Sequence, residues 1–202
     1  MKVEDELPPE IVAVLNSPEF DDEAGIVIDS AEFTDTTLLL KFSFRYYNEE
    51  FPTQQWELIV DNVEEEKIVR QWTQHIAIYK THPLLLKYTD IQTELYIKGT
   101  NNHTQDLFIE IYQSLLNLTG NIRYLEGYVL TPNRVADLSE QGHGLFARGP
   151  KTILMVYQKC LIDYGIHAYF IADKGHIPNK FLKVFVLGDS YIIGNSFAFQ
   201  RQ

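Results

Sequence analysis

Hydrophobic and polar side chains alternate along several short stretches of this chain, a pattern typical of strands with one packed face and one solvent-facing side. In residues 40–46, a leucine, two phenylalanines and a tyrosine occupy every second position, and the positions between them are polar. The same period-two pattern recurs in residues 54–60 and 91–98. Because antiparallel sheets often bury one face and leave the other in solvent, we expect a mostly antiparallel sheet.

Polar or glycine-containing connections separate the candidate strands, and the final connection, Gly188-Asp189, suits a two-residue hairpin turn. Residues 122–130 are a further strand candidate, interrupted by Gly127. The strands expected from the pattern are residues 25–33, 37–47, 54–61, 66–72, 74–80, 91–98, 166–172, 181–187 and 191–199.

The hydrophobic period changes in the middle of the chain. Leu107, Ile111, Leu115 and Leu118 recur at spacings of four, four and three, which predicts a helix over residues 105–118. A similar apolar face predicts a second helix over residues 151–164, and shorter helical segments are expected near residues 10–15 and 82–88. The chain is therefore expected to be α+β, with an N-terminal meander and a C-terminal hairpin covered by two central helices.

Charge is distributed unevenly. The net charge of the 202 residues is −11, and eight acidic side chains lie within residues 1–23. We expect an acidic N-terminal segment at 1–23 followed by one domain at 24–202. An acidic chain repels the phosphate backbone, so the composition argues against a nucleic-acid partner. A solvated segment is the leading interpretation of residues 1–23, and docking of this segment on a basic partner is the alternative.

The single cysteine, Cys160, indicates a reducing compartment, since it has no internal disulfide partner. The acidic start of the chain is unlike a secretory signal, and no apolar run approaches the roughly 18 residues needed to span a bilayer. We therefore expect a cytoplasmic protein that makes no membrane contact.

Residues 131–150 are rich in glycine and proline and run directly into the helix expected at 151–164. Free amides at a helix N-terminus bind phosphate well. This makes the segment the candidate ligand site, with the residues Gly142, His143, Gly144, Arg148 and Gly149.

The segment resembles the loop that holds the coenzyme A pyrophosphate in the GNAT family of N-acetyltransferases, over residues 141–195 at most. It departs from that loop at Ser139, where the family has a basic or amide residue, and at Pro150, which lacks an amide hydrogen. The resemblance implies an alternative function as an acyl-coenzyme-A-dependent N-acyltransferase. A tight structural turn before the helix is the other interpretation.

Other chemistry has little support in the sequence. Cys160 could act as a nucleophile with His167 as base, but its place on an apolar helix stripe favours a core cysteine. The six histidines lack the paired spacings of metal sites, and no nucleophile or nucleotide motif is present. We predict no catalytic residue, metal or cofactor.

Several aromatic residues lie where strands end or meet polar turns: Tyr47, Trp72 and Tyr191. A place in the core is the leading interpretation of such rings, and these three are the candidates for a partner surface. Strands, aromatic residues and acidity without a catalytic constellation favour a non-enzymatic binding protein. The leading hypothesis is an acidic cytoplasmic protein that binds a protein partner, or a second copy of itself, through a sheet face or edge.

Overall fold

The computed structural model describes residues 6–21, 24–47, 51–100, 103–119, 141–174 and 181–202. The α+β class is confirmed, with antiparallel sheets and a few helices. The chain divides into two compact units: unit 1 comprises Met1–His82 and Phe181–Gln202, and unit 2 comprises Pro83–Lys180. Each unit encloses its own hydrophobic cluster, whereas the hydrophobic pattern led us to expect one core under one domain.

Unit 1 contains two four-stranded antiparallel sheets. The first has the order β1 (Ala24–Thr34), β2 (Thr37–Tyr46), β3 (Gln54–Asp61) and β11 (Ser196–Arg201). The second has the order β4 (Glu65–Lys67), β10 (Ser190–Gly194), β9 (Lys183–Leu187) and β5 (Ile76–Tyr79).

The two sheets of unit 1 share one core of phenylalanine and aliphatic side chains. Phe42 of β2 lies 6.4 Å, between ring centroids, from Phe185 of β9, and both rings are buried. Helices α1 (Pro9–Leu15) and α2 (Pro18–Asp21) belong to the same core, into which α1 buries Ile11 and Val14. The acidic N-terminal stretch therefore carries a packed apolar side besides its charges.

The expected single strand at 191–199 is two strands, because the chain crosses from one sheet to the other at Asn195. A Cβ at Gly194 would lie 2.6 Å from Val60 Cγ1 and 3.1 Å from the Asp61 carbonyl. The close approach of β3 requires a residue without a side chain at this crossing.

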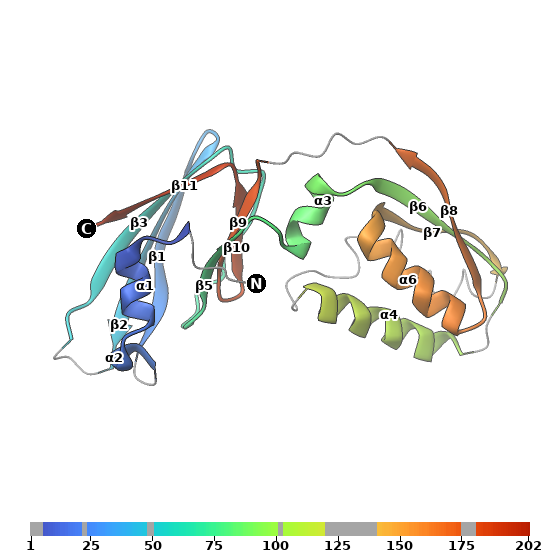
Figure 1. Ribbon diagram of the computed structural model, residues 1–202, viewed down its shortest axis with the longest axis horizontal. Coiled ribbons are helices and arrows are strands. Elements are labelled where there is room, and N and C mark those ends of the chain that lie inside the picture. Colours follow the sequence, from blue (N-terminus) through green and yellow to red (C-terminus); the bar gives the residue numbers. More distant parts are fainter. Residues whose placement is uncertain (1–5, 22–23, 48–50, 101–102, 120–140, 175–180) are drawn as a thin grey trace. The chain divides into compact units, whose positions relative to one another are not determined.

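Unit 2 contains a three-stranded antiparallel sheet in the order β7 (His143–Pro150), β6 (Gln92–Lys98) and β8 (His167–Lys174). Figure 1 shows α4 (Thr104–Thr119) and α6 (Lys151–Asp163) together on one side of this sheet. Leu95 and Ile97 of β6 point into the core beneath these helices. A short 3-10 turn, η2 (Pro83–Leu85), and α3 (Leu86–Thr89) precede β6.

The expectation of a loop up to residue 150 is wrong for residues 143–150, which form strand β7. Residues 143–150 pair along the whole length of β6, with a bulge that places both Phe146 and Ala147 in the core. Glycines at the ends hid the strand in the sequence, because they break the alternation that identifies one. The strand expected at 122–130 lies outside the described residues.

Candidate functional site

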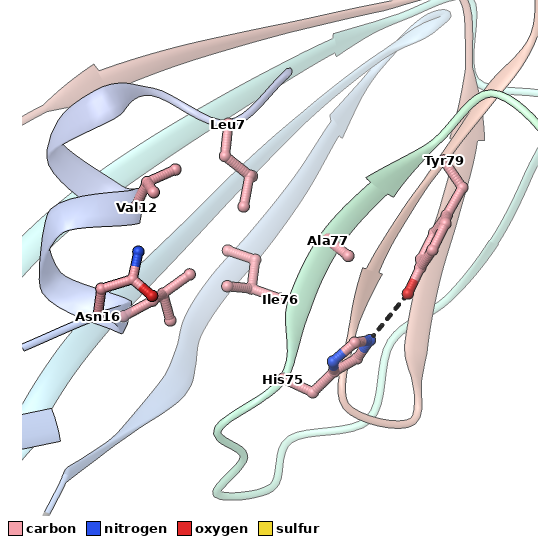
Figure 2. A pocket seen from close by; sticks show the side chains of 8 residues that line it. Leu7, Val12, Asn16, His75, Ile76, Ala77 and Tyr79 are labelled. Atoms are coloured by element: carbon pink, nitrogen blue, oxygen red, sulfur yellow. Dashed lines mark hydrogen bonds between the residues drawn. The ribbon is translucent and has the colours of Figure 1, made fainter. Parts of the chain in front are cut away.

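A cavity of about 270 Å³ lies in unit 1 between helix α1 and strand β5. Figure 2 shows Ile76 pointing from the strand toward the helix, whereas Ala77 and Tyr79 lie on the other side of the strand. The lining is mostly apolar and consists of Leu7, Val12, Leu15, Asn16, His75, Ile76, Ala77 and Tyr79. We call this the α1–β5 groove.

Helix α1 has two apolar sides, one that packs in the core and one that forms a wall of the groove. Ile11 and Val14 are buried in the core, while Val12 and Leu15 are only partly buried and line the cavity. A helix of seven residues has little stability in isolation, so packing on the core holds α1 in place. The sequence predicted the helix but gave no sign that it would face β5.

Strand β5 forms the other wall and is the last strand of its sheet. It pairs with β9 from Ile76↔Leu187 to Tyr79↔Val184. No described strand pairs with the other side of β5, and Ile76, Ala77 and Ile78 of this strand are buried. This edge of the sheet borders the cavity.

His75 and Tyr79 add polar atoms to the groove. Tyr79 Oη lies 3.4 Å from His75 Nε2, and Figure 2 marks this contact. Burial raises the pKa of the Tyr79 phenol above its usual value. The groove therefore presents an apolar interior with a phenol and an imidazole at one side.

An ion-pair cluster ties the chain before α1 to the end of β5. Glu6 accepts from Lys80 Nζ at 2.6 Å and from Lys183 Nζ at 2.9 Å. Burial raises the pKa of Glu6, the two lysines lower it, and the net shift is downward. Lys80 directly follows β5, and Lys183 is the first residue of β9.

The charge of the chain is confined to unit 1. Its residue ranges hold 19 acidic and 8 basic side chains, a net charge of −11, whereas unit 2 holds 9 of each. Glu10 on α1 and Glu19 on α2 are exposed, and both helices belong to the unit that holds the groove. The groove thus lies in a strongly negative unit.

The glycine-rich candidate site is arranged differently from the expectation. His143 and Arg148 lie on strand β7, where Arg148 Nε is 3.0 Å from Glu94 Oε1. Gly144 and Gly149 are paired positions of the same strand, and the Gly142 carbonyl accepts from Gly99. Four of the five candidate residues therefore lie in a strand instead of a phosphate-holding loop.

The N-terminus of α6 already carries an internal carboxylate. The Thr152 amide donates to Asp90 Oδ2 at 2.7 Å, and the Ile91 amide donates to Asp90 Oδ1 at 2.8 Å. A carboxylate at this position satisfies the first turn of the helix and repels a phosphate. Both the strand and this cap weigh against the acyltransferase alternative.

Two of the three candidate surface aromatics come together. The rings of Tyr47 and Trp72 stack with centroids 5.1 Å apart, and the two residues are 72% and 42% exposed. Tyr191 is only 6% exposed, and its hydroxyl donates to Glu65 Oε1 at 2.7 Å. The expectation of Tyr191 as a surface residue is therefore wrong, because β10 is an inner strand of its sheet.

Cys160 and His167 are not brought together. The Cys160 thiol is buried, and its Sγ lies 3.5 Å from Ser114 Oγ of α4. His167 is exposed, and its place in β8 beside the buried Ala168 puts it on the side of the sheet that faces away from the helices. Across the described ranges, no three of the His, Cys, Asp and Glu side chains gather as a metal site would need.

Comparison of this chain with family models, with curated proteins and with solved structures found no match. Of the helices in the described residues, none has the length and apolar run that crossing a bilayer requires.

Proposed function

We propose that this protein binds an extended, basic segment of a partner protein in the α1–β5 groove. The observation that carries the proposal is the side of β5 with which no described strand pairs, next to an apolar cavity. In β-augmentation, a peptide adds as a strand to such an edge, main-chain hydrogen bonds supply affinity, and pockets for alternate side chains supply specificity.

The size of the cavity favours a peptide over a small organic ligand. Small-molecule sites usually measure roughly 300–1,000 Å³ and enclose most of the ligand. At about 270 Å³, the groove suits one or two apolar side chains of a strand lying along β5. Val12, Leu15 and Ala77 would contact those side chains.

The charge of unit 1 sets the chemistry of the partner. A net charge of −11 on unit 1 attracts lysine and arginine and speeds the association of a basic segment. Since side chains alternate along a strand, the fitting segment has apolar residues directed into the groove and basic residues directed outward. A cytoplasmic location remains part of this proposal, because the buried Cys160 thiol needs no oxidising compartment.

A displayed library of random peptides of about twelve residues, panned on the full chain, tests this function. We expect enriched sequences that alternate apolar residues with lysine or arginine. Leu15→Trp fills the cavity and should weaken the enriched peptides by about tenfold or more. Ala13→Trp places the same ring on the exposed side of α1 and is the matched control, which should keep binding.

Melting temperatures establish that both tryptophan variants fold, and Val12→Phe replaces Leu15→Trp if the latter does not. Enrichment of acidic peptides, or of peptides that bind Leu15→Trp as well as the natural chain, would overturn the proposal. An empty selection would overturn it equally.

A further inference from the structure

The three-stranded sheet of unit 2 has a second face, opposite α4 and α6. Thr93, Leu95 and Ile97 of the central strand β6 are buried on the helix side. The residues between them are partly or fully accessible, as expected for a face that no described helix covers. Figure 1 shows both long helices on the other side.

Strand register arranges this face in three rows that cross all three strands. Directly opposed residues of antiparallel strands share a face and lie close together. From the β7 side to the β8 side, the rows are His143, Lys98 and His167; Leu145, Tyr96 and Tyr169; and Arg148, Glu94 and Ile171.

The middle row is an aromatic platform. The rings of Tyr96 and Tyr169 are stacked, with centroids 6.2 Å apart and planes inclined by 24°. The His167 ring continues this series, 5.4 Å from Tyr169. The Tyr96 hydroxyl donates to Glu94 Oε2 at 3.0 Å, and the same carboxylate accepts from Arg148, so the platform is held in a fixed orientation.

The first row is a line of basic groups, with Lys98 between two exposed histidines. Neighbouring strands are about 4.8 Å apart, so the row spans about 10 Å. Unit 2 as a whole is neutral, and the acidity that argued against a nucleic-acid partner resides in unit 1.

From this arrangement we infer that the face of the unit 2 sheet opposite α4 and α6 binds single-stranded nucleic acid. A base stacks on the Tyr96–Tyr169 platform, because such stacking needs only an accessible aromatic ring and tolerates any base. The neighbouring phosphates lie against Lys98, His143 and His167. This activity is separate from the groove of unit 1.

Fluorescence anisotropy tests the inference, with fluorescein-labelled oligomers of about ten deoxythymidines or ten uridines and the full chain at about 50 mM salt. We expect saturable binding that weakens as salt rises. Tyr96→Leu and Tyr169→Leu should each reduce affinity on the order of tenfold, whereas Tyr96→Phe keeps the ring and should keep binding. Lys98→Ala should reduce affinity and flatten the salt dependence.

Matched controls lie on the helices of the same unit. Tyr112→Leu changes an exposed ring that stacks on Phe108 of α4, and Lys159→Ala removes an exposed cation of α6. Both should leave binding unchanged. The inference would be overturned if neither oligomer bound or if binding survived both leucine variants. Equal competition by polyglutamate would overturn it too.

Discussion

The indole ring of Trp72 lies against the backbone of Gly25, so closely that a Cβ at residue 25 would overlap ring atoms of Trp72. The same ring stacks on the ring of Tyr47, and both residues are exposed. A residue of β1 without a side chain thus positions the exposed aromatic pair that the sequence marked as a candidate surface.

Gly25→Ala should destabilise the protein by about 1–3 kcal/mol, because the added methyl group displaces the indole ring. Urea unfolding followed by tryptophan fluorescence measures the loss. In a Trp72→Ala background the same change should cost far less, since the obstructing ring is gone. An equal loss of stability in both backgrounds would show that the contact between Gly25 and Trp72 is not its cause.

The two hydrophobic clusters should respond separately to truncation. Phe42→Ala removes a buried ring of unit 1 and Phe146→Ala one of unit 2, and each should cost about 3–5 kcal/mol. Hydrogen exchange followed by mass spectrometry should show lost protection in β2 and β3 for the first variant, and in β6 and α6 for the second. Uniform loss of protection along the chain in both variants would contradict two cores.

Acid should weaken the Glu6 cluster in a defined direction. The pKa of Glu6 is lowered in the folded protein, so its contribution to stability is present above the unfolded value of 4.5 and is lost as pH falls through the folded value. We expect Glu6→Gln to be less stable than the natural chain at pH 7, with the difference shrinking below pH 4.5.

Urea unfolding at a series of pH values measures this difference. The matched background is Lys80→Met with Lys183→Met, in which Glu6 lacks both ion-pair partners. Glu6→Gln should have little effect there. A difference that stays constant across the pH range would exclude the ion pairs as its cause.

Much of the fold could be predicted from the sequence, because local patterns encode it. The alternation in residues 37–47 and the helical spacing from Leu107 to Leu118 correspond to β2 and α4. Strand β7 was missed because its glycines and bulge interrupt the alternation. The break at Asn195 was missed because it depends on the contact of Gly194 with Val60, a long-range relationship.

The candidate sites depend even more on long-range contacts. Leu15 and Ala77 line one groove although about sixty positions separate them in the chain. His143 and His167 flank Lys98 only through strand register. The distribution of charge between the two units could not be predicted from composition. Composition gives one net charge for the chain, whereas the whole of this net charge belongs to the residues of unit 1.

The most direct test of the α1–β5 groove is an amide NMR titration of the isotope-labelled full chain with a synthetic peptide of alternating valine and lysine. The account predicts that the largest shift changes fall on Ile76–Tyr79 and on Val12 and Leu15, and that Leu15→Trp abolishes them. Shift changes that cluster on another strand, or a spectrum that the peptide leaves unchanged, would contradict it.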